Sequence, residues 1–254
     1  MERGGHTYRF IDTAGIRRKG KTRLVAEKLS VVMARKHLEE ADIALLVIDA
    51  AEGVTALDAT IAGYAHESGR SVIIVVNKWD LVARPQDEPA RRATTRHRGG
   101  AQFRRGGMMG RVAARSGNGH KPAGRRIYEE ELRQQLKFLN YAPVVFVSAK
   151  AGKNVEKIFE LVAQVAAERR KRITTGEMNR FLAEVDFERA SVPYSRRVKI
   201  YYVTQAGTSP PTFVLFTDRA VKLHFSYERF LENQIRRAFG FAGTPIRIKT
   251  RARS

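Results

Sequence analysis

The sequence predicts an α/β fold, a parallel sheet with flanking helices, followed by a smaller α+β domain. Residues 43–48, 72–76 and 144–147 are almost continuous runs of apolar residues, as is typical of parallel strands buried on both faces. Segments with helical spacing of apolar residues alternate with these runs. Each run ends close to a polar residue, and ligands of doubly wound sheets bind at these carboxyl ends.

The remaining elements follow in order along the chain. We predict a first strand at residues 8–11 and helices at residues 24–40, 56–66, 127–139 and 155–167, the last with Asn154 as its N-cap. After a basic stretch at 169–172, the predicted order is α-β-β-α-β, at residues 174–187, 198–204, 212–217, 227–239 and 245–248. We therefore expect a first domain over residues 1–172 and a second over residues 173–254.

Composition narrows the class of protein and of partner. The chain holds 47 Lys and Arg against 26 Asp and Glu, a net charge of +21, which attracts polyanions such as RNA. It has no Cys, so we expect no disulfide-linked partner, and this composition fits a reducing, cytoplasmic location. No apolar run reaches the roughly 18 residues of a membrane span, so we expect no membrane partner.

Residues 84–126 differ from the sequence around them. This stretch carries twelve Lys or Arg residues against Asp87 and Glu88, is rich in Gly and lacks apolar periodicity. We predict a disordered, arginine-rich insertion in the first domain. A segment of this kind either folds on RNA or is a solvated insertion without a function, and both interpretations remain open.

The motif Asn77-Lys78-Trp79-Asp80 directly follows a predicted buried strand. The Asp80 carboxylate can accept two parallel hydrogen bonds from N1–H and the exocyclic amine of guanine, a donor pair that adenine lacks. We expect the Lys78 stem to lie along the base and Asn77 to tie the neighbouring loops together. Ser148-Ala149-Lys150, after the next strand, is expected to offer a backbone N–H to guanine O6.

A second motif, Asp12-Thr13-Ala14-Gly15, ends the first predicted strand. In a complete guanine-nucleotide domain this Asp lies near Mg²⁺, through water, and the Gly N–H contacts the γ-phosphate. A phosphate loop of the GxxxxGK[ST] type belongs ahead of these motifs, and we do not expect that pattern anywhere in this chain. We therefore expect a chain without a phosphate loop.

These segments resemble the second G domain and the KH-like domain of the GTPase Der (EngA) family. The resemblance is carried by residues 11–21 and 41–53, by Asn77-Lys78-Trp79-Asp80-Leu81-Val82, and by residues 139–143 leading into Ser148-Ala149-Lys150. Tyr201-Tyr202-Val203-Thr204-Gln205 and the Pro210-Pro211 turn resemble the KH-like domain of that family. The likeness covers nearly the whole chain apart from residues 84–126.

The resemblance implies a truncated P-loop GTPase-type sheet, without its phosphate loop and switch I, followed by a KH-like domain. It implies GTP or GDP as ligand, Mg²⁺ and K⁺ as ions, and the large ribosomal subunit with its rRNA as partner. The residues that it marks as GTP-binding are Asp12, Thr13, Ala14, Gly15, Ile16, Asn77, Lys78, Trp79, Asp80, Ser148, Ala149 and Lys150, with Asp12 holding Mg²⁺ through water in a complete domain. Ile16 cannot orient a water molecule as the Gln of Ras-like enzymes does. No residue is assigned a catalytic role, and we expect the chain alone to bind GTP weakly and not to hydrolyse it.

Three explanations fit such a chain. It is a fragment of a full GTPase whose N-terminal segment is missing, one half of a split GTPase completed in trans, or a nonenzymatic RNA-binding remnant. For RNA, the candidate phosphate contacts in the second domain are Arg196, Arg197, Lys199, Arg247, Lys249, Arg251 and Arg253, unless these form a plain solvated face. The aromatic residues Tyr201, Tyr202, Phe213 and Phe216 are expected to pack in the core rather than stack on bases.

Overall fold

The computed structural model describes residues 1–11, 36–82, 124–185, 198–219 and 222–253. Its first part is built on a parallel sheet of β3 (Ile43–Asp49), β4 (Ser71–Asn77) and β5 (Val144–Phe146), in the order β3-β4-β5. The three apolar runs of the sequence are therefore parallel strands, as predicted. The carboxyl ends of the strands bring Asp49 and Asn77 side by side as register partners.

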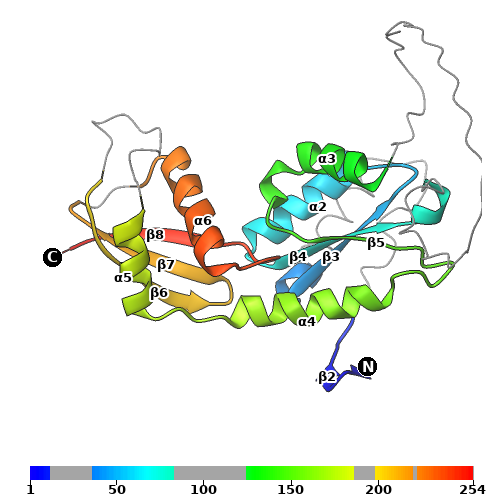
Figure 1. The fold of residues 1–254 in the computed structure, drawn as a ribbon, viewed down its shortest axis with the longest axis horizontal. Helices are drawn as coiled ribbons and strands as arrows, with labels where there is room; N and C mark the ends of the chain where they lie inside the picture. Colours follow the sequence, from blue (N-terminus) through cyan, green and yellow to red (C-terminus); the bar gives the residue numbers. More distant parts are fainter. Residues whose placement is uncertain (12–35, 83–123, 186–197, 220–221, 254) are drawn as a thin grey trace, which may run out of the picture.

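Helices cover both faces of this sheet (Figure 1). Helices α2 (Ala56–Glu67) and α3 (Arg125–Gln135) lie on one side, and α4 (Glu156–Arg170) lies on the other. Alternate side chains of β4 pack on opposite faces of the sheet. Ile74 packs in the core formed with α2 and α3, whereas Ile73 packs in the core that includes Val165 of α4. Burial on both faces explains why β4 is apolar throughout.

The first residues of the chain differ from the prediction. Residues 8–11 form no strand. A short hairpin of β1 (Glu2–Arg3) and β2 (His6–Thr7) precedes them. The rings of Tyr8 and Phe10 contact that of Phe159 on α4, with centroids 5.6 and 6.1 Å away. The aromatic side chains of the predicted strand thus lie against a helix, where Tyr8 is half-buried and Phe10 remains 56% exposed.

Two predicted helix boundaries also change. Asn154 is not the N-cap of α4, because its side chain donates a hydrogen bond to the Phe146 carbonyl (3.0 Å) and the cap position falls on Val155. The predicted helix at 127–139 splits into α3 and a 3-10 turn at Lys137–Leu139. Residues 36–40 are helical, and residues 24–35 of the predicted first helix lie outside the described residues.

The second part of the chain follows the predicted α-β-β-α-β order. It consists of α5 (Thr175–Glu184), β6 (Ile200–Thr208), β7 (Pro211–Thr217), α6 (Phe225–Phe239) and β8 (Arg247–Ala252). Strands β6 and β7 are antiparallel, and β8 pairs with β7 in parallel. The last strand begins two residues later than predicted and runs further.

Side chains of the second sheet alternate between a core and an outer face. Phe213 is fully buried with residues of α5 and α6, as predicted for the core. Tyr202 and Phe216 are half-buried on the other face, where their rings stack at 4.2 Å and 12°. Tyr202 and Phe216 are not part of the buried core, and Tyr201 is 41% exposed, so the predicted core packing is wrong for these three rings. A bulge between Ile200 and Tyr202 changes the alternation at that point.

The two parts meet at the amino-terminal end of β4, through the loop that follows α6. The Gly243 N–H donates to the Tyr141 carbonyl (2.9 Å), and the Gly243 carbonyl accepts from the Val72 N–H (2.7 Å). The hydroxyls of Ser71 and Thr244, both buried, are 2.9 Å apart. The loop is therefore bonded to the start of β4, at the end opposite Asn77.

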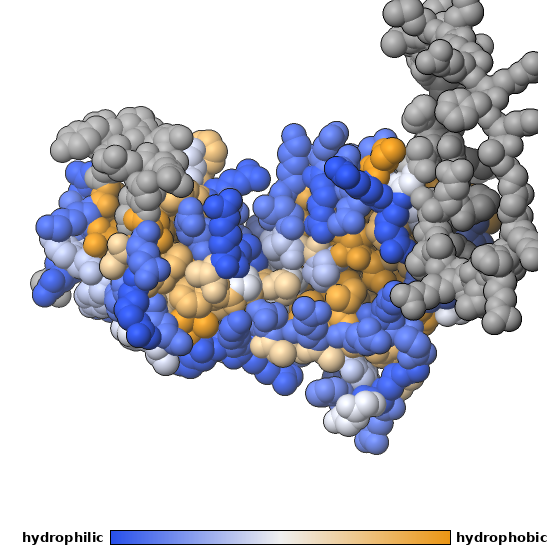
Figure 2. Space-filling model, viewed as in Figure 1, coloured by the Kyte–Doolittle hydropathy of each residue, from blue (hydrophilic) through white to orange (hydrophobic). Residues whose placement is uncertain are grey.

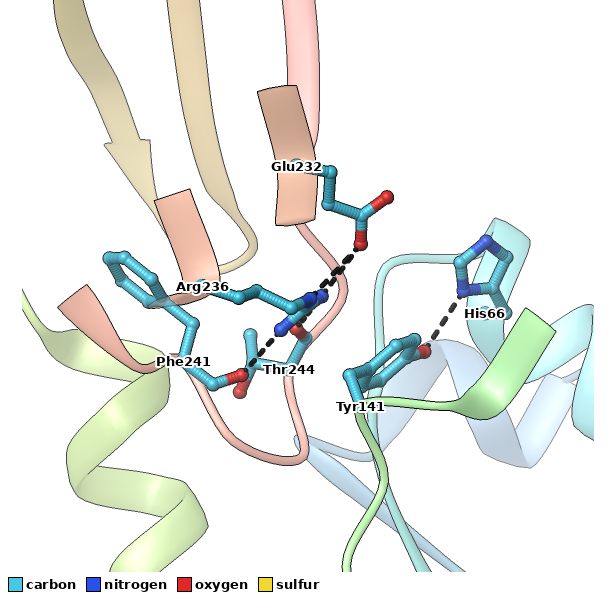
Figure 3. A network of polar contacts seen from close by, with 6 residues as sticks. All are labelled: His66, Tyr141, Glu232, Arg236, Phe241 and Thr244. Atoms are coloured by element: carbon cyan, nitrogen blue, oxygen red, sulfur yellow. Dashed lines mark hydrogen bonds and ion pairs between the residues drawn. The ribbon is translucent and has the colours of Figure 1, made fainter. Parts of the chain in front are cut away.

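Arg236 of α6 contacts residues from both sides of this junction (Figure 3). Its guanidinium donates to the carbonyls of Phe241 (2.7 Å) and Thr244 (2.8 Å), forms an ion pair with Glu232 (2.8 Å), and lies 4.5 Å from the ring centroid of Tyr141. The Tyr141 hydroxyl in turn contacts Nδ1 of His66 on α2 (2.9 Å). Burial raises the pKa of Tyr141 and lowers that of His66. Both groups are therefore neutral in the packed junction near neutral pH.

The surface is mostly hydrophilic on the face drawn in Figure 2. Hydrophilic residues cover α3 and α4 there, and hydrophobic residues are visible between these helices, where the sheet lies. In the described ranges, no helix is long and apolar enough to cross a bilayer. Of the predicted arginine-rich insertion, residues 84–123 lie outside the described residues, and Arg125 and Arg126 begin α3.

Candidate functional site

The loops after β4 and β5 lie against each other. The Trp79 N–H donates to the Val147 carbonyl (3.0 Å), and the Val147 N–H donates to the Val76 carbonyl (2.8 Å). Parallel pairing thus continues past the last residue of β5 and joins the two loops. The segments predicted to read a purine base are therefore neighbours at one edge of the sheet.

Asn77 connects these loops through its side chain. Its Oδ1 accepts hydrogen bonds from the backbone N–H of Lys78 (2.8 Å) and of Ala149 (3.0 Å). This confirms the prediction that Asn77 ties the neighbouring loops together. Removal of the amide would leave both N–H groups without this acceptor, so the residue type is explained by loop geometry alone.

Lys78 is held in an unusual conformation. Its φ is 59° and its ψ 32°, the left-handed region, which non-glycine residues seldom adopt. Its ammonium forms an ion pair with the Asp49 carboxylate at 2.6 Å. Asp49 was not among the residues singled out from the sequence. The signal was present, because Asp49 ends a buried strand just as Asn77 does.

Trp79 is buried, whereas Asp80 is exposed. The Trp79 indole is 8% exposed and packs edge-to-face on Phe146 (4.6 Å) and Tyr128 (5.4 Å). Asp80 is exposed. The 3-10 turn at Trp79–Leu81 thus buries the indole and presents the carboxylate at the loop surface. Of these two predicted site residues, only Asp80 has a side chain available to a ligand.

The tripeptide Ser148-Ala149-Lys150 forms a tight turn. Ser148 is buried, its backbone pairs with Lys153, and its Oγ accepts from the Ala151 N–H (3.2 Å). Ala149 and Lys150 are exposed. Because Asn77 already takes the Ala149 N–H, the turn is fixed next to the Asn77–Asp80 loop.

Tyr128 lies beneath this loop, with its hydroxyl buried and without a hydrogen-bond partner among the described residues. Burial, reinforced by the negative charge of Asp49, raises its pKa to about 12. The phenol therefore stays neutral and serves as packing for Trp79. No group of three or more Asp, Glu or His residues that could hold a metal occurs in the described part of the chain.

The other predicted site residues, Asp12 to Ile16, lie outside the described residues. The expectation that the pattern GxxxxGK[ST] is absent from the chain is wrong, because residues 15–22, GIRRKGKT, match it. The match shares Gly15 with the Asp12–Gly15 motif and follows Asp12 instead of preceding it. A phosphate loop connects a strand to a helix, and this stretch is outside the described ranges.

Comparisons with known proteins agree with the two-part fold. Residues 5–168 match the family model of the elongation factor Tu GTP binding domain. Residues 172–251 match the model of the KH-domain-like region of EngA bacterial GTPase enzymes, C-terminal. The family models thus meet close to the end of α4.

Several relatives carry the same name. GTPase Der of Syntrophotalea carbinolica is 43% identical over 249 residues, which is 98% of this chain and 48% of the relative. GTPase Der of Geobacter metallireducens is 41% identical over 247 residues, with 97% and 48% covered, and that of Moorella thermoacetica is 41% identical over 251 residues, with 98% and 49% covered. The chain spans about half the length of the curated relatives it matches. The chain belongs to the GTPase Der (EngA) family and corresponds to the carboxyl-terminal half of its members, a G-domain-like α/β part followed by a KH-like domain.

Proposed function

We propose that this chain recognises guanine nucleotides through the loop Asn77–Asp80. The observation that carries the proposal is the pair of hydrogen bonds from Lys78 and Ala149 to the Asn77 side chain, which joins the two loops expected to surround a base. Asp80 is exposed beside them and can accept both donors of the guanine edge. Adenine leaves that carboxylate unpaired, so we expect discrimination against it.

We expect the phosphate end of the site to contribute little to binding. Backbone N–H groups of a phosphate loop and its helix supply most contacts to a triphosphate. No such loop precedes Asp12 in this sequence, so we expect weak binding of GTP and no hydrolysis above background by the chain alone. Asp12, the residue expected to hold Mg²⁺ through water, lies outside the described residues, and the proposal concerns only recognition of the base.

The test uses Trp79, the single Trp of the chain, as a fluorescent reporter next to Asp80. Titration with guanosine and GDP is expected to change its emission, whereas adenosine and ADP leave it unchanged. In Asp80→Asn the amide can donate to the C2 carbonyl of xanthine, so preference should move from guanosine to xanthosine. Equal binding of adenosine and guanosine by the unmodified chain would overturn the proposal.

Lys21→Met tests the GxxxxGK[ST] match separately. If residues 15–22 held the phosphates, this substitution would weaken GDP and leave guanosine unaffected. The resemblance places these residues in switch II instead, so we expect both ligands to bind Lys21→Met as they bind the unmodified chain.

The edge position of β3 in the described sheet supports the idea that a second polypeptide completes the G domain. This strand is the edge of the described sheet, and Val47 in its middle is 54% exposed. An exposed apolar edge of this kind can pair with a further strand. If the chain is half of a split GTPase, a separately expressed segment with a phosphate loop should co-purify with it, reduce the exposure of β3 amides to hydrogen exchange and restore GTP hydrolysis.

RNA association is the second candidate function, favoured by the outer face of the second sheet. There the ring of Phe216 stacks on that of Tyr202, and Phe216 is the register partner of Arg251 on β8. Lys249, two residues before Arg251 on the same strand, is exposed. Tyr201 lies between the cations of Lys199 and Arg253, 5.3 Å from each. Exposed and half-buried aromatic rings beside basic residues suit single-stranded RNA. The large ribosomal subunit and its rRNA, in the cytoplasm, are the partners that we propose.

This candidate is tested by the salt dependence of binding to a single-stranded RNA. We expect the affinity to fall steeply as salt rises, with a smaller slope for a Lys249→Ala/Arg251→Ala variant and no change in Asp80→Asn. Gly240–Gly243 has the spelling GxxG of a KH clamp, but both glycines lie in the junction, so we assign the loop no RNA contact. Binding that ignores salt would count against this function.

We also propose that the domain boundary lies between residues 172 and 173. Val165 packs in the core of the first sheet, whereas Ile173 packs with Met178 and Phe213 in the core of the second. Separate expression of residues 173–254 as a folded unit would support this division.

A further inference from the structure

Asp49 and Lys78 come from neighbouring strand ends. Asp49 is the last residue of β3 and the register partner of Asn77, so Lys78 lies one residue beyond the end of β4. The 2.6 Å ion pair therefore requires the lysine side chain to cross from β4 towards β3. The four methylenes of the side chain lie between these two fixed points.

Asp49 is the rigid partner of this pair. Its side chain is 17% exposed against 55% for Lys78. Its Oδ1 accepts a hydrogen bond from the Ala51 N–H (2.9 Å), and the next residue, Ala50, donates its N–H to the Asn77 carbonyl (2.8 Å). The carboxylate is thus held by its own loop and by the neighbouring strand.

We propose that Asp49 is a positioning residue of the guanine site: its carboxylate holds the Lys78 ammonium, so that the lysine stem is already extended across the strand ends as the surface against which the base lies. This rests on the proposed function of the Asn77–Asp80 loop. A lysine stem is apolar and flat enough to pack on a purine. A free lysine loses much rotamer entropy when it is ordered, and an anchored one has already lost it.

The proposal and plain electrostatics predict opposite results. Asp49→Asn removes a negative charge near the site, which by charge alone favours an anionic nucleotide. If Asp49 acts by anchoring Lys78, the same substitution weakens the ligand, by about tenfold for loss of most of the lysine order. The loss should be equal for guanosine and GDP because it concerns the base.

Three further measurements distinguish the positioning role of Asp49 from a purely structural role. Because Lys78 is 55% exposed, its ion pair contributes little to stability, and the Asn side chain keeps the oxygen that accepts from the Ala51 N–H, so Asp49→Asn should leave the urea midpoint nearly unchanged. Lys78→Met keeps an apolar stem without the charge, and in this background Asp49→Asn should have no further effect on guanosine affinity. Glu160→Gln, which removes an exposed carboxylate on α4, is the matched control and should leave the affinity unchanged.

The experiment uses the 254-residue chain, Trp79 fluorescence for guanosine and GDP, and NMR relaxation of the Lys78 ε-methylene without ligand. We expect restricted motion of that methylene in the unmodified chain and free motion in Asp49→Asn. A freely moving Lys78 in the unmodified chain, or tighter GDP binding by Asp49→Asn, overturns the positioning role alone. A chain that binds no guanosine overturns the proposed function together with this one.

Discussion

Gly243→Ala is the sharpest test of how the two parts of the molecule are joined. Gly243 has a φ of +71°, and both its N–H and its carbonyl are bonded to the first part of the chain. A Cβ built there lies 2.5 and 2.9 Å from the two methyl groups of Val165 and 3.3 Å from Cδ of Pro143. Real Cβ atoms do not approach other carbons so closely, so either the loop or α4 has to move.

The expected destabilisation has two sources. The left-handed backbone costs about 1 kcal/mol for Ala relative to Gly. Overpacking of a close-packed contact costs about 1–3 kcal/mol more. Gly53→Ala supplies the matched control, because Gly53 has a φ of +79° with no atom within 4 Å of its Cβ position. We expect about 2–4 kcal/mol for Gly243→Ala and only about 1 kcal/mol for Gly53→Ala.

The assay is urea unfolding followed by circular dichroism and by Trp79 fluorescence, which reports on the first part of the chain. In Gly243→Ala we expect a lower midpoint and separate transitions for the two probes, because the junction opens before the cores unfold. Val165→Ala removes both clashing methyl groups, so the double variant should lose less than the sum of the two single losses. Equal losses for Gly243→Ala and Gly53→Ala would falsify the described packing of the junction.

Three further predictions concern single groups. Arg236→Ala removes the donor to two carbonyls and the partner of Glu232, so we expect a loss of about 3 kcal/mol in urea unfolding, and Arg236→Lys should recover only part of it. Burial holds the pKa of His66 below its ordinary 6.5, so the unfolded chain binds the proton more readily than the folded chain. The contribution of His66 to stability should be complete above pH 6.5 and fall as the pH drops towards the lowered pKa. His66→Gln should remove this pH dependence from urea midpoints measured between about pH 5 and 8. Thr55→Ala removes the side chain that forms a capping box with Asp58 at the start of α2, and should cost about 1 kcal/mol by the same assay, whereas Thr60→Ala, an exposed position in the same helix, should cost less.

Local patterns in the sequence account for most of the first sheet. Continuous apolar runs predicted β3, β4 and β5, because parallel strands lack the polar alternation of a strand with one face in water. The polar residues just beyond β4 predicted the loop that Asn77 holds together. Both predictions concern residues close in sequence to a strand end, where periodicity and motif spacing are informative.

The errors have the opposite character. Residues 8–11, predicted as a strand, form no strand and contact Phe159. Asn154, predicted as a helix cap, donates a hydrogen bond to the Phe146 carbonyl instead. Asp49 was not recognised as the partner of Lys78. Phe159 is far in sequence from Tyr8, and Asp49 is 29 residues from Lys78, whereas the Phe146 carbonyl is only eight residues from Asn154. In all three cases the contact depends on how the chain folds back, which side-chain patterns do not reveal.

Strand β4 joins the junction to the candidate site. Ser71 and Val72 at its start are bonded to the second part, and Asn77 at its end organises the loop that presents Asp80. Register pairs with β3 hold all seven residues of β4, while the junction contacts only the first two. A displacement caused by Gly243→Ala should therefore decay along the strand, and the variant should bind guanosine within about twofold of the unmodified chain. If guanosine affinity falls together with stability, the two ends of β4 are energetically coupled. The contacts of the second domain with the start of β4 then contribute to guanosine binding.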